Sequence, residues 1–359
     1  MPRVSVITPV RDGESFLGEA IGSVLSQTFG DFEYIVVDDA STDRTPDIIG
    51  RFARMDPRLV PCRNASSLRH SGSLNRALAL ARGEFVAILD ADDIAMPERL
   101  ERQVAYLDEH PEVGAVGAQA VLVDAGGNRL QEMGFPATPA LARWRILYGT
   151  PLLHSAATMR RALVEQVGGY SVHHRYATDF ELFSRLVGVT RLANLPEVLV
   201  SYRRNPGQIS AVSGRPQLGE VVLLIHAMLA GRLGLRVGLD DVALLFRAVR
   251  GGDVPNEKAL LGTAELLGRI HARYEEVEPL DDEGRQAVRQ SCAWLWVVMA
   301  YTHHRGHREA SQRILRRARG LDPGLWRRQG TAEKLRRLRN SSAARGAKAG
   351  SPPVASPEG

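Results

Sequence analysis

Apolar runs and helix-like segments alternate along the N-terminal third of this chain of 359 residues. The runs at 4–10, 32–37 and 83–89 are rich in Val, Ile and Phe, which is typical of buried strands. Between them lie segments with apolar residues at helical spacing, such as 15–27 and 71–82. This alternation predicts an α/β fold, in which helices cover both faces of a mostly parallel, Rossmann-like sheet.

Carboxylates follow two of these strand-like runs. The run at 83–89 ends in Asp90-Ala91-Asp92-Asp93, and the run at 32–37 ends in Asp38-Asp39. Ligands bind outside the carboxyl ends of strands in open α/β sheets, so we expect both acidic strand ends to face one site. Hard oxygen donors in such a place suit Mg²⁺ or Mn²⁺ carrying a phosphorylated substrate.

A solvated acidic turn is the alternative interpretation of residues 90–93. In that case Asp93 caps the helix that starts near Pro97. A motif as short as Asp-x-Asp-Asp does not decide between the two by itself.

Composition places the chain among ordinary globular proteins, with 44% hydrophobic and 24% charged residues. Its two cysteines, Cys62 and Cys292, form no ligand pattern, so we expect neither a disulfide framework nor a zinc site. Met1-Pro2-Arg3 leads directly into a strand, which argues against a signal peptide. The apolar run at 292–301 is too short to span a bilayer. We therefore expect a cytoplasmic protein whose contact with the inner membrane face is at most peripheral.

The pattern divides the chain into three parts. Residues 1–214 contain the strand-like runs, and the period is helical throughout 215–340. Residues 341–359 are Ala, Gly, Ser and Pro with few apolar residues, which predicts a disordered tail.

The helical part has two features that bear on partners. From His303 to Lys348 there are fourteen Lys or Arg against three acids, an excess that suits peripheral contact with anionic lipid. A solvated helix face is the favoured alternative, and we expect no nucleic-acid partner. Trp294 and Trp296 cannot share one helix face, so at least one is expected to pack against another domain or subunit, which leaves an oligomer open.

Further motifs follow one another in a fixed order. They are Val4–Pro9, Glu19–Thr28, Val36–Asp43, Asn75, Gly83–Asp93 and Pro97–Leu100 with Gln103. In these segments, from about Val4 to Ser210, the chain resembles family 2 glycosyltransferases. The resemblance implies a GT-A fold in which a nucleotide-diphosphate sugar lies across the sheet edge.

The resemblance also implies which residues bind this donor. Thr8 and Pro9 would line the base pocket, with Asp12 or Glu14 nearby, and Asp39 would accept a hydrogen bond from N3–H of uracil or thymine. Asp90 would face the ribose or the metal. The implied donor-binding set is Thr8, Pro9, Glu14, Asp39, Asn75, Asp90 and His154.

The resemblance places a divalent cation, Mn²⁺ or Mg²⁺, on Asp92 and Asp90, where it would stabilise the leaving diphosphate. Asp179 occupies the place of the catalytic base, although Thr178 replaces the Glu that usually precedes it. A helix cap is the alternative role of Asp179. His154 would bind acceptor or diphosphate, with a core histidine as the alternative. Asn205 departs from the family's usual Tyr-Arg-x-His segment, which argues against a role in binding diphosphate.

These observations predict a metal-dependent, inverting, non-processive glycosyltransferase of the hexosyl type. A UDP- or TDP-sugar is the favoured donor, and the acceptor is a hydroxyl of a glycan, a lipid-linked precursor or a small molecule in cell-surface glycan synthesis. One alternative is a catalytically silent sugar-nucleotide-binding scaffold. Another is a nucleotidyltransferase, but the loop after the first strand lacks the expected glycines.

Overall fold

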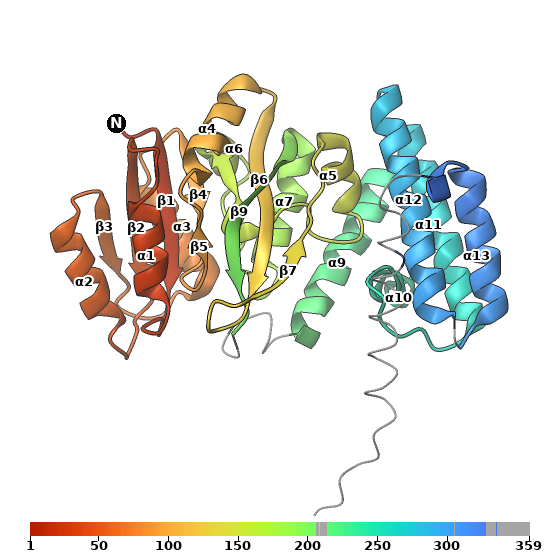
Figure 1. Cartoon of the computed structure of the whole chain (residues 1–359), viewed down its shortest axis with the longest axis horizontal. Helices are drawn as coiled ribbons and strands as arrows, with labels where there is room; N and C mark the ends of the chain where they lie inside the picture. The colour runs from red at the N-terminus through yellow and green to blue at the C-terminus, as the bar shows by residue number, and fades with distance from the viewer. Residues whose placement is uncertain (206–207, 209–213, 305, 328–334, 336–359) are drawn as a thin grey trace, which may run out of the picture. The chain divides into compact units, whose positions relative to one another are not determined.

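The structure is a computed structural model that describes residues 1–205, 208, 214–304, 306–327 and 335 (Figure 1). The chain forms two compact units that divide between Met228 and Leu229. The sequence pattern predicted a boundary at 214, whereas helix α9 (Gly214–Leu233) runs across the division. The tail expected at 341–359 lies outside the described residues.

The first unit is built on one mixed sheet, which has nine strands within the described residues. Its strands are β1 (Val4–Val10), β2 (Phe32–Asp38), β3 (Leu59–Arg63), β4 (Phe85–Ile88), β5 (Ile94–Ala95), β6 (Val113–Val123), β7 (Arg129–Met133), β8 (Thr158–Arg160) and β9 (Arg191–Arg203). The order is β3-β2-β1-β4-β8-β6-β9-β5, and β7 pairs with β6. The first four of these are parallel neighbours, whereas β8 is antiparallel to both β4 and β6.

Helices cover both faces of the parallel part, as the alternation predicted. The chain moves outward from β1 to β3 through α1 (Leu17–Leu25) and α2 (Thr45–Met55). It then returns to β4 through α3 (Arg69–Leu80). Because such crossovers are right-handed, the reversal of direction places α3 on the face opposite α1 and α2. The other helical segments of this unit are α4 (Arg99–Glu109), α5 (Pro139–Arg145), η1 (His154–Ala156), α6 (Arg161–Gln166) and α7 (Thr178–Val189).

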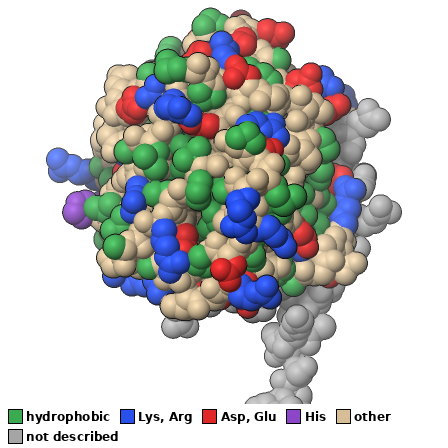
Figure 2. Space-filling model, turned by 90° about the vertical axis from the view of Figure 1, so that its left-hand side faces the viewer, with side chains coloured by type: hydrophobic (Ala, Val, Ile, Leu, Met, Phe, Trp, Pro, Cys, Tyr) green, Lys and Arg blue, Asp and Glu red, His purple; other side chains and the backbone are tan. Residues whose placement is uncertain are grey.

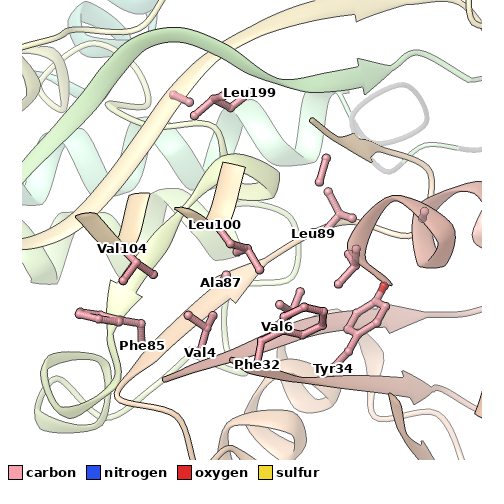
Figure 3. Packing of buried hydrophobic residues seen from close by; sticks show 14 of the residues in the cluster. Val4, Val6, Phe32, Tyr34, Phe85, Ala87, Leu89, Leu100, Val104 and Leu199 are labelled. Atoms are coloured by element: carbon pink, nitrogen blue, oxygen red, sulfur yellow. The ribbon is translucent and has the colours of Figure 1, made fainter. Parts of the chain in front are cut away.

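A large core cluster lies between the sheet and the helices α1, α2 and α4. Val4 and Val6 of β1 pack there with Phe85 of β4, because alternate strand residues share one face. Figure 3 shows them beneath Leu100 and Val104 of α4. This packing fixes the strand ends from which the acidic loops leave.

The second unit is helical, as predicted. After α9 it contains α10 (Leu239–Val249), α11 (Glu257–Val277), α12 (Asp282–His303), α13 (Arg308–Leu321) and η2 (Leu325–Arg327). Trp296 packs inside this unit, where its indole N–H donates to the carbonyl of Ala264 at 2.9 Å. Within the described residues, every helix is too short or too polar to cross a membrane.

The face of the first unit at β3 and α2 carries mixed charge. Figure 2 shows Arg interspersed with Asp, Glu and apolar side chains on this face, and residues 1–228 contain no Lys. Nucleic-acid binding relies on neutralising phosphates with clustered Lys and Arg. The charge on this face therefore does not favour such a partner, whose absence stays a prediction.

Candidate active site

The two acidic strand ends meet at one edge of the sheet, as predicted. Asp39 follows β2 and Asp90 lies just beyond β4, with β1 between these strands. The chain leaves β1 toward β2 on one side and later returns to β4 on the other. This reversal is the topological switch point at which open α/β sheets bind ligands.

Asp39 is buried and accepts four hydrogen bonds from the segment after β3. Its Oδ1 accepts from the Asn64 side chain at 2.6 Å and from Leu68 N–H at 2.7 Å. Its Oδ2 accepts from Ser67 Oγ at 2.6 Å and from Arg69 N–H at 2.9 Å. Burial alone would raise the pKa of Asp39, but these hydrogen bonds outweigh it and hold the pKa below its usual value. A carboxylate has about four acceptor positions, so a base N–H would have to replace one of these donors.

Asp90, Asp92 and Asp93 form a cluster of carboxylates with few partners. Burial and the charge of Asp90 raise the pKa of Asp92 to about 6. Burial and both neighbouring carboxylates raise the pKa of Asp93 well above its usual value. Oδ1 of Asp90 and Oδ2 of Asp93 are buried without a hydrogen-bond partner among the described residues. Unpaired buried oxygens are unfavourable, so the cluster is poised to take up a cation or a proton.

Two buried arginines lie against this cluster. Arg99 donates to the carbonyl of Ile88 at 2.8 Å, and burial lowers its pKa to about 10. Arg203 donates to the carbonyl of Asp92 at 2.9 Å. The backbone N–H of Arg203 donates to Asp93 Oδ1 at 2.8 Å, so Asp93 joins two segments of chain. The alternative in which Asp93 caps the following helix is therefore wrong, and the N-cap of α4 is Glu98.

Asn205 contacts the cluster directly. Its side-chain amide donates to Asp92 Oδ2 at 2.6 Å. In the sequence, the departure of Asn205 from the family's usual residue argued against a role in binding diphosphate. An amide at this position still supplies a donor that steadies Asp92.

The apolar run at 152–159 predicts a strand, whereas His154 lies on the 3₁₀ turn η1. It is buried, and its Nε2 shares a hydrogen bond of 2.9 Å with Tyr170 Oη. Its Nδ1 lies 3.8 Å from Asp90 Oδ1. Burial lowers the pKa of His154, but the attraction of Asp90 outweighs it and the net pKa is raised.

Asn75 supports this histidine through Tyr170. Its amide donates to the Tyr170 carbonyl at 2.7 Å, and Tyr170 N–H donates to Asn75 Oδ1 at 2.8 Å. Both ends of the Asn75 side chain are thus engaged with backbone, which leaves little capacity for the donor contact predicted for it.

His70 belongs to the same site, although no pattern in the sequence marked it as a site residue. It lies at the start of α3, and its ring is edge-on to that of His154 with 5.8 Å between centres. Burial lowers its pKa, which keeps the ring neutral. A single His in a helix has no periodicity or spacing that marks it, so tertiary structure alone reveals its place.

Asp179 is the second residue of α7, and the N-cap is Ala177. Phe183, one turn later on the same helix face, has its ring 6.5 Å from that of His154. The charge of Asp179 raises the pKa of His154 and of Tyr170, after the larger effects of burial and Asp90. The structure thus brings Asp179 to the His154 side of the site.

The segment before α7 is held by two side chains. Thr178, which replaces the family's Glu, shares a hydrogen bond of 3.2 Å with Ser71 of α3. Glu220 of α9 accepts from the backbone N–H groups of Arg175, Tyr176 and Ala177 at 3.0, 2.9 and 2.8 Å. This carboxylate fixes the approach to the helix that carries Asp179.

The remaining predicted residues lie in β1 and the loop after it. Thr8 is fully buried, and its hydroxyl contacts the Leu89 carbonyl at 2.7 Å and Tyr34 Oη at 2.9 Å. Pro9 is buried beside it, whereas Glu14 is exposed and accepts from Arg44 N–H at 3.1 Å. The Thr8 side chain therefore belongs to the core, and we leave it out of the donor contacts proposed below.

Comparison with known proteins agrees with this fold. The family described as "Glycosyl transferase family 2" matches residues 5–168. The chain is 33% identical over 260 residues to the putative glycosyltransferase EpsE of Bacillus subtilis, which covers 71% of this chain and 92% of EpsE. It is 29% identical over 219 residues to the amylovoran biosynthesis glycosyltransferase AmsE of Erwinia amylovora, covering 60% of this chain and 80% of AmsE.

Among solved structures, S. aureus TarS 1-349 in complex with UDP-GlcNAc shares the fold. The TM-score is 0.54 at 21% identity, over 91% of this chain and 92% of that one. The predicted GT-A fold with a helical C-terminal region is thus confirmed. The chain belongs to the family 2 glycosyltransferases, and it is a glycosyltransferase.

Proposed function

We propose that this glycosyltransferase is metal-dependent and inverting, and that it moves a sugar from a nucleotide-diphosphate sugar to an acceptor hydroxyl. The observation that supports this most is the meeting of the Asp90–Asp93 cluster with the Asp179 helix at the sheet's switch point. A sugar transfer needs a place for diphosphate and a base beside it. The two acidic groups supply these two roles from separate elements.

Asp90 and Asp92 are the residues we assign to a divalent cation. Oδ1 of Asp90 is buried with no hydrogen-bond partner among the described residues, and burial together with the charge of Asp90 raises the pKa of Asp92. All-oxygen ligands of this kind fit Mg²⁺ or Mn²⁺. The bound ion would stabilise the negative charge that develops on the leaving diphosphate.

Asp179 is the base we assign to the acceptor. Its carboxylate would take the proton of the acceptor hydroxyl as that oxygen attacks the anomeric carbon from the side opposite the diphosphate. Pro9, Glu14 and Asp39 at the other end of the site remain our assignment for the base of the nucleotide.

UDP-sugars are the first donors to test, because TarS, which shares the fold, was solved with UDP-GlcNAc. TDP-sugars follow, since the same base edge is presented. Similarity to AmsE, named for amylovoran biosynthesis, supports an acceptor that is a glycan or a lipid-linked precursor in cell-surface synthesis.

A cytoplasmic reaction at the inner membrane face completes the proposal. Arginines 308, 313, 316, 317 and 319 of α13 are exposed and suit anionic lipid. Sedimentation with phosphatidylglycerol vesicles tests this contact. Binding that does not weaken when these arginines are replaced by Gln would rule it out.

Hydrolysis of sugar nucleotides is the test of the central proposal, because it needs no acceptor. We expect turnover of a UDP- or TDP-sugar with Mn²⁺ or Mg²⁺, and its loss with chelator or in Asp92→Ala. Calorimetry with UDP, TDP and GDP should show nucleotide binding that depends on the cation. Binding without cation would remove metal dependence from the proposal. Binding without turnover on any acceptor would favour the silent scaffold.

A further inference from the structure

His70, Asp90 and His154 form a compact group of cation ligands on the side of Asp90 that faces η1. Each side chain offers one ligand atom, and the three atoms lie within 4.8 Å of one another. The residues come from α3, from the loop after β4 and from η1, which are remote in sequence. The fold, and not a local motif, brings them together.

The distances suit a shared ion. Nδ1 of His154 is 3.8 Å from Oδ1 of Asp90, and that oxygen is buried with no hydrogen-bond partner in the described part of the chain. Two atoms that each bind one ion at about 2.0–2.2 Å are at most about 4.4 Å apart. An ion can therefore join His154 to Asp90 as they stand, and the ligand atom of His70 lies within 4.8 Å of the other two.

His154 is already oriented for this role. Its Nε2 is engaged with Tyr170 Oη at 2.9 Å, and Tyr170 is held in turn by Asn75. This leaves Nδ1 directed toward Asp90. Imidazoles that bind metals in proteins commonly have their second nitrogen held by such a partner, which fixes the ring.

We infer that His70, Asp90 and His154 bind a divalent transition-metal ion that accepts imidazole ligands, with Zn²⁺ and Co²⁺ as the best fits. Two imidazoles and one carboxylate suit these ions, whereas Mg²⁺ prefers oxygen ligands and water. Three protein ligands leave a further position open to water or substrate. The inference goes beyond the donor cation proposed above, because this ligand set includes both histidines and excludes Asp92.

Titration of the full chain with Co²⁺, after chelator treatment and without nucleotide, tests the inference. We expect the visible absorption of imidazole-bound Co²⁺, with a millimolar excess of Mg²⁺ failing to displace it. His70→Ala, which removes one ligand, should weaken binding by about 100-fold, and Tyr170→Phe, which removes the support of His154, by about 10-fold. His70→Gln keeps the side-chain volume and should weaken binding as His70→Ala does.

Asp240→Asn in α10 is the control, because it removes an exposed carboxylate that belongs to neither proposed cation site. It should keep Co²⁺ binding within about 3-fold of the unaltered chain. Loss of nucleotide-free binding in Asp92→Asn but not in His70→Ala would place the ion at Asp92 and overturn the inference. Absence of an imidazole-bound Co²⁺ spectrum in the unaltered chain would also overturn it.

X-ray absorption at the zinc edge gives the same answer without any variant. Two imidazole nitrogens on Zn²⁺ in the unaltered chain are expected, and oxygen-only coordination would contradict the site. No sugar nucleotide enters these measurements. Failure of the proposed transfer reaction therefore leaves this test readable, and failure of this test leaves the transfer reaction open.

Discussion

Buried or half-buried carboxylates lie at both ends of the parallel sheet, and Glu33 at the amino end differs from Asp92 and Asp93 at the carboxyl end. At the amino end, Glu33 of β2 accepts from Ser5 Oγ at 2.7 Å, from Arg82 N–H at 2.8 Å and from the Arg82 guanidinium at 2.6 and 2.8 Å. Burial would raise the pKa of Glu33, but these partners outweigh it and lower the pKa. At the carboxyl end, the pKa values of Asp92 and Asp93 are raised.

Backbone strain follows the same division. Among the described residues, the non-glycine residues with positive φ are Asp12, Ala40 and Arg69, at +49°, +58° and +61°. They lie in the connections that follow β1, β2 and β3, at the carboxyl end. Glu33 at the amino end is thus paired and serves stability. Asp39 at the carboxyl end is paired as well, but the Asp90–Asp93 cluster there keeps buried oxygens with no partner among the described residues, close to strained backbone, as functional sites do.

The largest expected effect separates activity from stability at the carboxyl end. Asp179→Asn should lower the rate of sugar transfer by about 10³-fold, the usual scale for loss of a general base. Its melting temperature should stay within about 2 °C of the unaltered chain, since the side chain is half-exposed. Initial rates with the donor identified by hydrolysis provide the measurement. Asp240→Asn, at the second position of α10, is the matched control and should keep full activity. A near-normal rate in Asp179→Asn would show that the base lies elsewhere.

The second-largest effect is expected at the amino end, where a substitution should lower stability and leave activity unchanged. A Cβ on Gly83 would lie 2.5 Å from Ser5 N and 2.7 Å from the carbonyl carbon of Val4, both backbone atoms. Gly83→Ala should therefore lower the free energy of unfolding by about 3 kcal/mol. The rate per folded molecule should not change. Gly22→Ala, where a Cβ meets nothing within 4 Å, should instead be neutral or stabilise α1 by about 0.5–1 kcal/mol. Urea unfolding compares the two, and equal stabilities would contradict the close contact.

A smaller effect concerns pH. The raised pKa of Asp92, about 6, means that the folded chain holds a proton which the unfolded chain has already lost. The free energy of unfolding of the metal-free protein should therefore fall as pH rises from about 4 to 6. Asp92→Asn removes this effect and should be more stable than the unaltered chain by about 1 kcal/mol at pH 7.5, with no difference near pH 4.

Glu33→Gln should show the opposite sign, destabilising at pH 7.5 and less so as pH falls below about 4.5, because the pKa of Glu33 is lowered. If the stability differences of Asp92→Asn and Glu33→Gln from the unaltered chain changed with pH in the same direction, the contrast between these carboxylates would be contradicted.

The smallest expected effect on stability tests the backbone strain at Ala40. Ala40 has φ +58° directly after Asp39, a conformation that is unfavourable for alanine and open to glycine. Ala40→Gly should raise the free energy of unfolding by about 0.5 kcal/mol, the relief of strain less the added entropy of the unfolded chain. Ala79→Gly in α3 should lower it by about 1 kcal/mol. Destabilisation by Ala40→Gly would show that the turn is not strained.

Sequence patterns predicted most of the elements that build this site. The runs at β1, β2, β4 and β6 are long and apolar, and the helices α1 to α4 have regular periodicity, so their type and order were readable. The short helices α5 and α6 were missed, because six or seven residues carry too little periodicity. His154 was assigned to a strand because the apolar run around it hides a single 3₁₀ turn.

The site could be predicted only to the level of its strand ends. Asp39, Asp90 and Asp92 follow apolar runs, and that position is visible in the sequence. Other features of the site depend on contacts between segments that are remote in sequence. They are the hydrogen bonds to the Asp39 carboxylate, the full burial of Thr8 and the pairing of Asn75 with Tyr170. His70 had no pattern at all, and the cysteine count that argued against zinc says nothing about imidazole ligands.

Glu220 shows where the catalytic unit has to end. A chain cut after residue 214 keeps every strand of the sheet, yet it loses the carboxylate that holds the N–H groups of Arg175, Tyr176 and Ala177. The segment leading into α7 would then have three backbone donors to satisfy from water. The first turns of α9 are therefore a functional part of the transferase. We expect the C-terminal region of a homologue to replace that of this chain only when the junction lies after these turns.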